Sequence, residues 1–302
     1  LPIRIGEIAH DFRYESSGTL KGIERGRHFC QNDAHLFVTP EQIKDEVTKV
    51  VHLIFDTYKD FGITNYRCVL SLRDPANKEK YHDDDEMWNT AEGALRDIMN
   101  SLGLEYTEEI GEAAFYGPKL DVNVQPAVGN EITLSTCQLD FCLPAKFNLY
   151  YIDKDGEKKT PVVLHRAILG SLDRFMAYIL EETKGNLPTW LAPVQTRVMP
   201  VKTDDEALNA YAKEVYDTLM ENDIRVELDD RAEKLGYRMR DGQIQKVPYL
   251  LVIGMNEKDN KTVTFRLHGE QETTTLPLDE FVENLKKEIN EKARTHMNHT
   301  EA

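Results

Sequence analysis

The rhythm of strand-like and helix-like segments changes once along this chain of 302 residues. Before residues 187–193 (LPTWLAP), strand-like runs follow one another without regular helices between them, whereas strands and helices alternate after that segment. The first pattern is typical of an α+β domain with an antiparallel sheet, and the second of a small α/β domain with a mostly parallel sheet. We therefore predict two domains, residues 1–190 and 191–302, each long enough to bury a core of its own.

Local signals predict individual elements within these domains. A helix begins at Thr39, with Pro40 at its first position and Gln42 three residues after the cap, and continues in helical periodicity until Gly62. We expect residues 120–124, 131–141 and 149–152 to form strands of one antiparallel sheet. A strand at 162–164 should lead into a helix from about 169 to 183. The polar C-terminus with His296 and His299 should fray.

Composition narrows the class of protein. The formal net charge of −16 argues against indiscriminate binding to polyanions, because that affinity comes from Lys and Arg neutralising phosphates. The four cysteines show no CxxC spacing, which argues against a disulfide framework and an all-cysteine zinc site. No apolar run is long enough to span a membrane and no export signal opens the chain, so we expect a cytoplasmic protein without membrane contact.

The opening hairpin concentrates side chains that suit a nucleotide. Arg13 and Arg25 flank its loop and could direct two guanidinium groups at phosphate or carboxylate oxygens. Glu15 could accept from an exocyclic amine, and Phe29 offers a ring on which a base could stack. By spacing alone, a solvated ion pair explains the same residues.

Two histidines 130 residues apart, His35 and His165, lie in mainly apolar strings. They could be hydrogen-bonded core residues, or they could belong to a catalytic metal site that keeps one position open for substrate. In the segment that contains Arg174, Asp173 could form a surface ion pair with a neighbouring basic residue, and Tyr116 could belong to an ordinary turn.

Several longer segments occur in an order that resembles a known family. FRYESSGTLKGIERGRHF with CQNDAHLF is similar to motif 2 of the class II aminoacyl-tRNA synthetases, and LHRAILGSLDRF is similar to their motif 3. AAFYGPKLDV, CQLDF, PTWLAPVQ and DDRAEKLGYRMRDGQIQKVPYLLVIG resemble segments of the threonyl-tRNA synthetases. The resemblance covers nearly the whole chain. It implies activation of threonine with ATP and transfer of the threonyl group to the 3′ end of tRNA(Thr).

The resemblance assigns roles in ATP binding. It implies that Arg13 contacts the α-phosphate and the substrate carboxylate, that Glu15 binds the adenine amine, and that Phe29 stacks on adenine. It places Lys119 near the α-phosphate and implies that Mg²⁺ binds together with the nucleotide. The other residues implied at the ATP site are Arg25, Gln138 and Arg174.

The resemblance also implies a threonine pocket with zinc. In this family a zinc ion binds the amine and hydroxyl of threonine, so that isosteric valine is rejected. His35 and His165 match two zinc ligands, while the third is a cysteine upstream of motif 2 that this chain lacks. The residues that match the surroundings of threonine are Gln31, Asp33 and Tyr116.

For the second domain the resemblance implies recognition of the tRNA anticodon, which an α/β fold alone does not indicate. The residues matched to anticodon contacts are Arg231, Arg240, Glu257 and Arg266. Lys234, Arg238 and Lys246 add local positive charge, which single-stranded bases and phosphates would meet. A solvated helix of mixed charge remains the alternative for each of these residues.

The same family pattern predicts that this chain is a fragment that begins inside the catalytic domain. Motif 1, which builds much of the dimer interface of the full-length homodimer, and the editing region would lie upstream. Two local departures are Asp173, where motif 3 usually has Glu, and Thr133, where Gln would be expected near adenosine. The alternatives are a noncatalytic relative that binds tRNA or a regulatory partner, and a synthetase for serine or proline.

Overall fold

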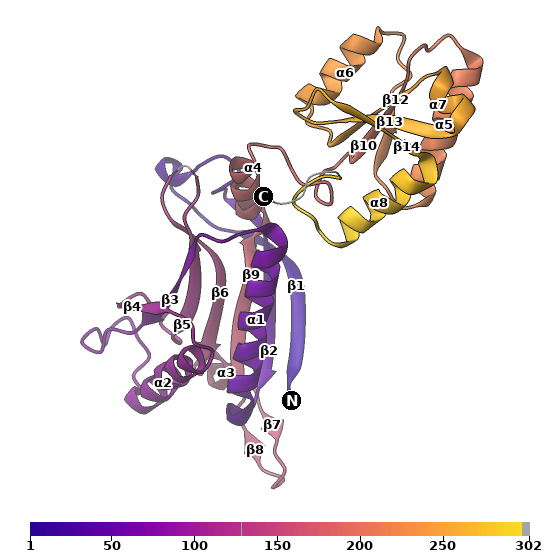
Figure 1. The fold of residues 1–302 in the computed structure, drawn as a ribbon. Helices are drawn as coiled ribbons and strands as arrows, with labels where there is room; N and C mark the ends of the chain where they lie inside the picture. Colours follow the sequence, from indigo (N-terminus) through magenta and orange to yellow (C-terminus); the bar gives the residue numbers. More distant parts are fainter. Residues whose placement is uncertain (128, 298–302) are drawn as a thin grey trace. The chain divides into compact units, whose positions relative to one another are not determined.

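The chain divides into two compact units, Leu1–Glu182 and Thr183–Ala302, in a computed structural model that describes residues 1–127 and 129–297 (Figure 1). The predicted boundary after residue 190 falls in the segment that joins the last helix of the first unit to the first strand of the second. No helix of these described residues is long and apolar enough to cross a membrane.

The first unit is built on a seven-stranded sheet with the order β1-β2-β9-β6-β5-β3-β4. Its strands are β1 (Ile3–Phe12), β2 (His28–Val38), β3 (Tyr66–Leu72), β4 (Tyr106–Ile110), β5 (Lys119–Val124), β6 (Ile132–Asp140) and β9 (Val162–Ser171). Neighbouring strands are antiparallel except β3 and β4, which are parallel. The predicted α+β class with an antiparallel sheet is confirmed.

The helices of the first unit begin and end largely where their capping signals lie. The helical elements are η1 (Ser17–Thr19), η2 (Pro40–Gln42), α1 (Ile43–Phe61), α2 (Asp85–Ser101), α3 (Leu143–Lys146) and α4 (Leu172–Glu182). The Gln42 side chain accepts a hydrogen bond of 3.0 Å from the Thr39 N–H, and Gly62 ends α1 in the left-handed conformation. Helix α1 packs along β9 and β6 (Figure 1).

Two expectations for the first unit are wrong. Residues 149–152 do not join the main sheet: β7 (Tyr151–Ile152) pairs with β8 (Lys158–Lys159) in a separate hairpin, because α3 and the left-handed Asn148 turn the chain away after β6. The helix predicted from about residue 169 begins at Leu172. Strand β9 continues through Ser171 because it lies between β2 and β6 and is hydrogen-bonded to both.

The second unit holds a five-stranded sheet with the order β11-β10-β12-β13-β14. Its elements are β10 (Thr196–Pro200), α5 (Glu206–Glu221), β11 (Val226–Leu228), α6 (Leu235–Ile244), β12 (Tyr249–Ile253), α7 (Met255–Asn260), β13 (Thr262–Leu267), β14 (Thr273–Pro277) and α8 (Leu278–Asn290). The expectation of a mostly parallel sheet is wrong: the pairs of β10 with β11 and β12 are parallel, whereas β12 with β13 and β13 with β14 are antiparallel. Residues 254–261 are fewer than the dozen or so that a parallel crossover needs, so β13 returns antiparallel.

The core of the second unit lies on both faces of its sheet. Leu251 and Ile253 of β12 pack with α5 and α8, whereas Leu250, which precedes Leu251 on the same strand, packs on the opposite side with Leu235 and Met239 of α6. His296 does not fray as expected, because its ring lies 5.6 Å from the Tyr249 ring. His299 lies outside the described residues.

Candidate functional site

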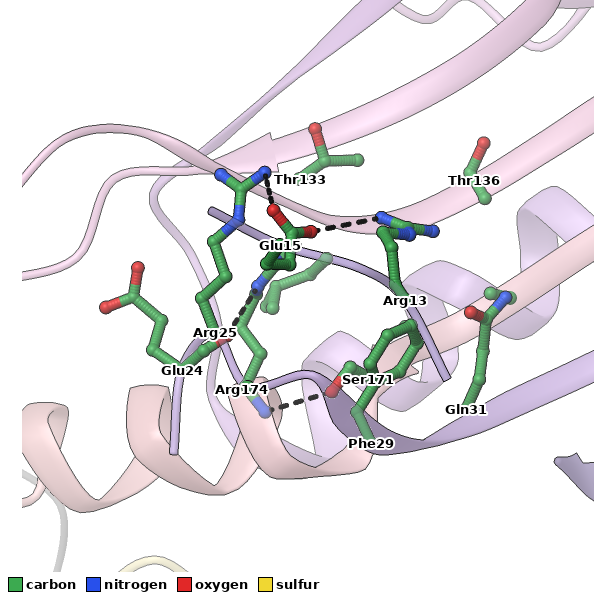
Figure 2. A pocket seen from close by; sticks show the side chains of 14 residues that line it. Arg13, Glu15, Glu24, Arg25, Phe29, Gln31, Thr133, Thr136, Ser171 and Arg174 are labelled. Carbon is green, nitrogen blue, oxygen red and sulfur yellow. Dashed lines mark hydrogen bonds and ion pairs between the residues drawn. The ribbon is translucent and has the colours of Figure 1, made fainter. Parts of the chain in front are cut away.

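A cavity of about 180 Å³ lies in the first unit, where the loop after β1 approaches β2, β6, β9 and the start of α4 (Figure 2). The residues that line it are Arg13, Glu15, Glu24, Arg25, Gly26, Phe29, Gln31, Thr133, Leu134, Thr136, Ala167, Gly170, Ser171 and Arg174. Residues up to 161 positions apart in the sequence, Arg13 and Arg174, therefore contribute to one cavity, and it includes most of the residues predicted to bind ATP.

Glu15 lies between two arginines of this cavity (Figure 2). One of its carboxylate oxygens is 3.3 Å from Arg25 Nη2, and the other is 3.9 Å from Arg13 Nη1. The Glu15 side chain is only 11% exposed, whereas those of Arg13 and Arg25 are 64% and 48% exposed. The buried Glu15 carboxylate thus orients both guanidinium groups, while several N–H donors of Arg13 and Arg25 face solvent.

Arg174 contributes the third guanidinium group, from the first turn of α4. Its Nε donates to the carbonyl of Glu24 at 3.3 Å, and its backbone N–H donates to Ser171 Oγ at 3.3 Å. Burial lowers the pKa of the Arg174 guanidinium, and the nearby positive charges of Arg25 and Arg13 act in the same direction. Three cations at one cavity suit a polyphosphate, whose oxygens accept charge-assisted hydrogen bonds.

Phe29 supplies an apolar surface beside these charges. The Arg13 guanidinium carbon lies 5.4 Å from the centroid of the Phe29 ring, within the range of a cation–π contact. An aromatic face next to phosphate-binding groups is an arrangement that can hold a nucleotide, since a base can stack on the ring.

Gly170 allows β9 to approach β6 closely at the inner wall of the cavity. Its φ is +60°, and a Cβ atom at this position would lie 2.6 Å from the carbonyl oxygen of Leu134. A side chain is therefore excluded on both backbone and steric grounds. Gly170 is followed by Ser171, the last residue of β9, whose Oγ accepts a hydrogen bond from the Arg174 N–H and so helps to place the start of α4.

A second group of predicted residues forms one row across four strands. Register pairs His35 of β2 with His165 of β9, His165 with Gln138 of β6, and Gln138 with Lys119 of β5. The two imidazole rings have centroids 4.7 Å apart and are nearly perpendicular, at 84°. Tyr116 joins this row by donating its hydroxyl hydrogen to Gln138 Oε1 at 3.0 Å.

The adjacent row connects these residues to the cavity. Register aligns Asp33 with Ala167, Ala167 with Thr136, and Thr136 with Asp121. Ala167 and Thr136 line the cavity. The row that contains His35 and His165 therefore lies next to the cavity, two residues further along each strand. Gln138 Nε2 is buried and finds no hydrogen-bond partner among the described residues. This unpaired donor is available to a ligand.

The paired histidines supply two imidazole nitrogen donors on neighbouring strands, which suits two corners of a tetrahedral zinc site. Over residues 1–127 and 129–297, however, no group of three or more His, Cys, Asp or Glu side chains is arranged to hold a metal ion. Asp33 Oδ2 lies 3.9 Å from His35 Nε2. A metal ion bound by these two histidines would need at least one further ligand.

The two departures from the family pattern have definite partners. Asp173 Oδ2 accepts from the backbone N–H of Cys30 at 2.8 Å and so joins α4 to β2. Thr133 lines the cavity and donates to Asn123 Oδ1 at 2.7 Å. Asp173 therefore makes a structural contact with β2, in addition to any surface ion pair with a neighbouring basic residue that the sequence left open.

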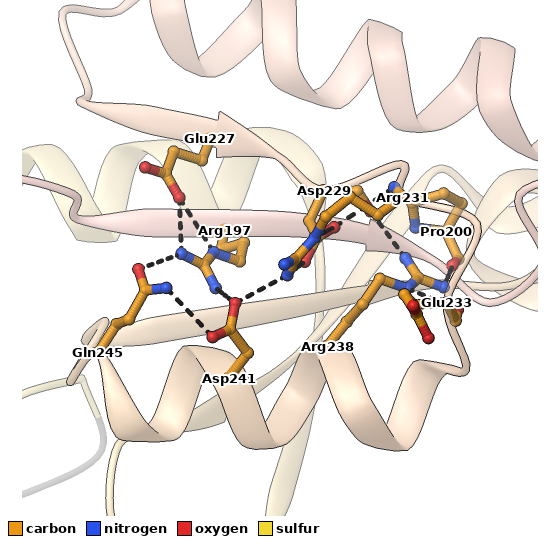
Figure 3. Close-up of polar contacts among 9 residues, drawn as sticks. All are labelled: Arg197, Pro200, Glu227, Asp229, Arg231, Glu233, Arg238, Asp241 and Gln245. Atoms are coloured by element: carbon orange, nitrogen blue, oxygen red, sulfur yellow. Dashed lines mark hydrogen bonds and ion pairs between the residues drawn. The ribbon is translucent and has the colours of Figure 1, made fainter.

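In the second unit, two of the predicted positive charges, Arg231 and Arg238, already have partners within the fold (Figure 3). Arg231 forms ion pairs of 2.7 Å with Asp229 and Asp241. Arg238 is 1% exposed and donates to backbone carbonyls, including those of Asp229 and Pro200 at 2.7 Å. The expectation that Arg238 adds to a positive surface is wrong, because the folded chain uses it to join two segments.

The other residues predicted to contact the anticodon lie in different settings. Arg240 is exposed on α6, and Arg266 is half-buried on β13 with an Nε atom that has no partner among the described residues. Both carboxylate oxygens of Glu257 are occupied: one accepts from the Gly254 N–H at 2.8 Å, and the other from Thr264 Oγ1 at 2.7 Å. In this arrangement Glu257 caps α7.

Comparison with known proteins connects both units to one family. Residues 1–183 match the family described as tRNA synthetase class II core domain (G, H, P, S and T), and residues 195–288 match the one described as anticodon binding domain. The chain is 53% identical over 289 residues to a threonine–tRNA ligase of Anoxybacillus flavithermus, with 96% of this chain and 45% of the relative covered. It also resembles a crystal structure titled as the RNA binding domain of threonyl-tRNA synthetase from Cryptosporidium parvum, with a TM-score of 0.87, 38% identity, and coverage of 95% of this chain and 70% of the other.

The chain belongs to the threonyl-tRNA synthetase family.

The resemblance seen in the motif segments is thereby confirmed, as is the class II synthetase core followed by an α/β anticodon-binding domain. A prolyl-tRNA synthetase of Cryptosporidium parvum shares the fold, with a TM-score of 0.69, 17% identity, and coverage of 96% of this chain and 54% of the other. The chain spans about 45% of the length of the curated threonine–tRNA ligase it matches.

Sequence reasoning missed several polar residues of this synthetase core. Glu24 lines the cavity, Asp121 is a buried acceptor beside Lys119, and Asp140 binds His165. Lys119 and Asp121 lie two apart on one strand, a spacing that puts both side chains on one face and could have indicated the pair. Nothing local marks the contact of Asp140 with a histidine 25 residues later.

Proposed function

We propose that this protein acts as a threonine–tRNA ligase. It would activate threonine with ATP to threonyl-adenylate and then transfer the threonyl group to the 3′ end of tRNA(Thr). The observation that carries the proposal is the cavity lined by Arg13, Arg25 and Arg174 beside the His35 and His165 row. Membership of the family supports the choice of amino acid. Because the chain spans less than half of its curated relative, the activity of the whole protein remains part of this proposal.

ATP would bind in the cavity with its phosphates among the three arginines. Arg13 would contact the α-phosphate and the threonine carboxylate, while Arg25 and Arg174 would hold the β- and γ-phosphates. Glu15 would accept from the adenine amine, and the base would stack on Phe29. Magnesium would accompany ATP and add positive charge at the phosphates.

The chemical step is attack of the threonine carboxylate on the α-phosphorus, in line with departing pyrophosphate. The protein's part is to align the reactants and to stabilise charge on the phosphate oxygens. Lys119 lies on the neighbouring strand, with its ammonium group bound to Asp121 at 2.5 Å. It would contribute to charge stabilisation once the α-phosphate is present.

Threonine would occupy the space between the cavity and the histidine row. Gln31, Asp33 and Tyr116 would surround it, and Gln138 Nε2 would donate to it. His35 and His165 would hold a zinc ion together with a further ligand. Bound zinc would coordinate the threonine amine and hydroxyl, which distinguishes threonine from valine better than an apolar pocket can.

The second unit would bind the anticodon of tRNA(Thr). Arg240 and Arg266 are the cations best placed for bases or phosphates, whereas Arg231 and Glu257 would have to exchange their present partners. We also propose, from the family, that the full-length enzyme is a homodimer and works in the cytoplasm.

Amino-acid-dependent ATP–pyrophosphate exchange tests this function. The assay would compare threonine with valine, serine and proline, with the zinc content measured alongside. We expect exchange with threonine that exceeds exchange with the other three. Exchange driven by serine or proline but not threonine would refute the specificity, and tRNA binding without any exchange would favour a noncatalytic relative.

A further inference from the structure

Asp140 lies at the end of β6, outside the set of residues that line the cavity. Its side chain is fully buried, and its Oδ1 accepts hydrogen bonds from the backbone N–H groups of Cys142 and Leu143 at 3.0 and 2.9 Å. These two bonds hold one oxygen at the turn that leads into α3. The other oxygen is therefore held in a fixed direction.

That second oxygen, Oδ2, lies 2.8 Å from Nε2 of His165. A carboxylate can only accept, so Nε2 must carry the hydrogen of this bond. In a neutral imidazole the other ring nitrogen then has a free lone pair, which here is Nδ1. Contacts of the ring with His35 at 4.7 Å and with Tyr116 at 5.6 Å between centroids further limit its rotation.

We propose that Asp140 is a positioning residue that holds His165 in the Nε2–H tautomer, so that Nδ1 is kept as a donor for a metal ion beside His35. The part that concerns the metal rests on the proposed function, whereas the tautomer does not. Metal-binding histidines commonly donate their second ring N–H to a carboxylate, which fixes the orientation of the ring. Here that carboxylate is anchored to the backbone on its far side.

The variant Asp140→Asn separates this role from a general structural one. The two backbone N–H groups require an oxygen, so the asparagine carbonyl should stay at Cys142 and Leu143 and the amide NH₂ should turn toward His165. An NH₂ group donates, so Nε2 becomes the acceptor and the hydrogen moves to Nδ1. The size of the side chain is unchanged.

Long-range ¹H–¹⁵N correlation spectra of the histidine-labelled protein at about pH 8 would identify the tautomer of His165. The His165 signals would be assigned from their loss in His165→Gln. We expect the Nε2–H form in the wild type and the Nδ1–H form in Asp140→Asn. Asp121→Asn is the matched control, since Asp121 is also a buried sheet carboxylate but binds Lys119, Ser71 and Thr136. An Nδ1–H form in the wild type, or one tautomer in all variants, would overturn the proposal. The wild-type spectrum decides the matter even if Asp140→Asn does not fold.

Titration with Zn²⁺ alone gives the second measurement. We expect Asp140→Asn to lower zinc affinity by about 10- to 100-fold and Asp121→Asn to leave it unchanged. Equal zinc affinity in the wild type and Asp140→Asn would contradict the role of Asp140 toward the metal. If the wild type binds no zinc but the tautomer switches as expected, the zinc site of the proposed function fails while the positioning of His165 by Asp140 stands.

Discussion

Single buried carboxylates determine how charged side chains are held in the first unit. Glu46 of α1 is almost fully buried and accepts from Arg4 of the edge strand β1 at 2.6 Å and from Lys49 at 2.7 Å. The Arg4 hydrogen bond is the main cause of a Glu46 pKa lowered to about 2, although burial opposes it. The ion pair therefore attaches β1 to α1 across 42 residues of sequence.

We expect Glu46→Gln to destabilise the protein by about 1 kcal/mol near pH 7, a modest value because half-exposed Arg4 is screened by solvent. Since the folded-state pKa lies below the ordinary value of 4.5, the stabilisation is present above about pH 5 and is lost as the pH falls toward 2. Urea denaturation of both proteins across this range would measure it. A difference between them that grows as the pH falls would contradict this assignment.

Among the arginines of the cavity, we expect Arg174 to tolerate substitution least, because it is half-buried and donates to the Glu24 carbonyl. We expect Arg174→Met to weaken ATP binding by about tenfold or more, as loss of a charge-assisted hydrogen bond does. Calorimetric titration with ATP would measure the change. Arg96→Met is the control, since Arg96 forms a surface ion pair with Glu108 and does not line the cavity. Equal losses in both variants would point to a general effect of charge.

At the scale of elements, the junction of β9 with α4 depends on Gly170. We expect Gly170→Ala to lower the free energy of unfolding by about 2 kcal/mol or more, because φ is +60° and the added methyl group would meet the Leu134 carbonyl. Gly93→Ala is the matched control: Gly93 lies inside α2 with nothing within 4 Å of the new methyl group. There we expect a gain of about 0.5–1 kcal/mol. Chemical denaturation of both variants would decide, and an unchanged Gly170→Ala protein would show that the junction can relax.

In the second unit, some helices have clear local sequence signals and others do not. Capping and periodicity indicated α8 and α5 well, whereas α7 was missed because its six residues are too few to show a period. Its N-terminus depends on the contact of Glu257 with Gly254. A sequence motif of glycine followed three residues later by glutamate could have indicated it.

At the scale of the whole molecule, the two units have separate cores. Among the described residues, the two buried clusters of the second unit draw on residues from Val194 onward. We expect residues 183–302 alone to fold and to unfold cooperatively on heating, as an independent domain does. Circular dichroism and a dispersed amide spectrum would measure this. Absence of a cooperative transition in the isolated segment would mean that its core needs the first unit.

Much of the architecture could be predicted from the sequence because its signals are local. Thr39 and Gln42 mark the start of a helix, Gly62 marks its end, and the change of rhythm near residues 187–193 separates two domains. The motif segments also indicated Arg13, Glu15 and Arg25, which lie within 13 positions of one another around a single hairpin loop. Such signals act over a few residues, so the chain carries them whatever its tertiary structure.

Only the tertiary structure decided which distant side chains meet. The row from His35 through His165 and Gln138 to Lys119 exists because four strands pair in one register, and a shift of one residue would turn each side chain to the other face. Burial likewise made Arg238 a structural donor and Asp140 the partner of His165. The sequence by itself thus determined most of the helices and strands, the two-domain plan and the family. Register and desolvation, which depend on contacts across the whole sheet, determined the geometry of the site.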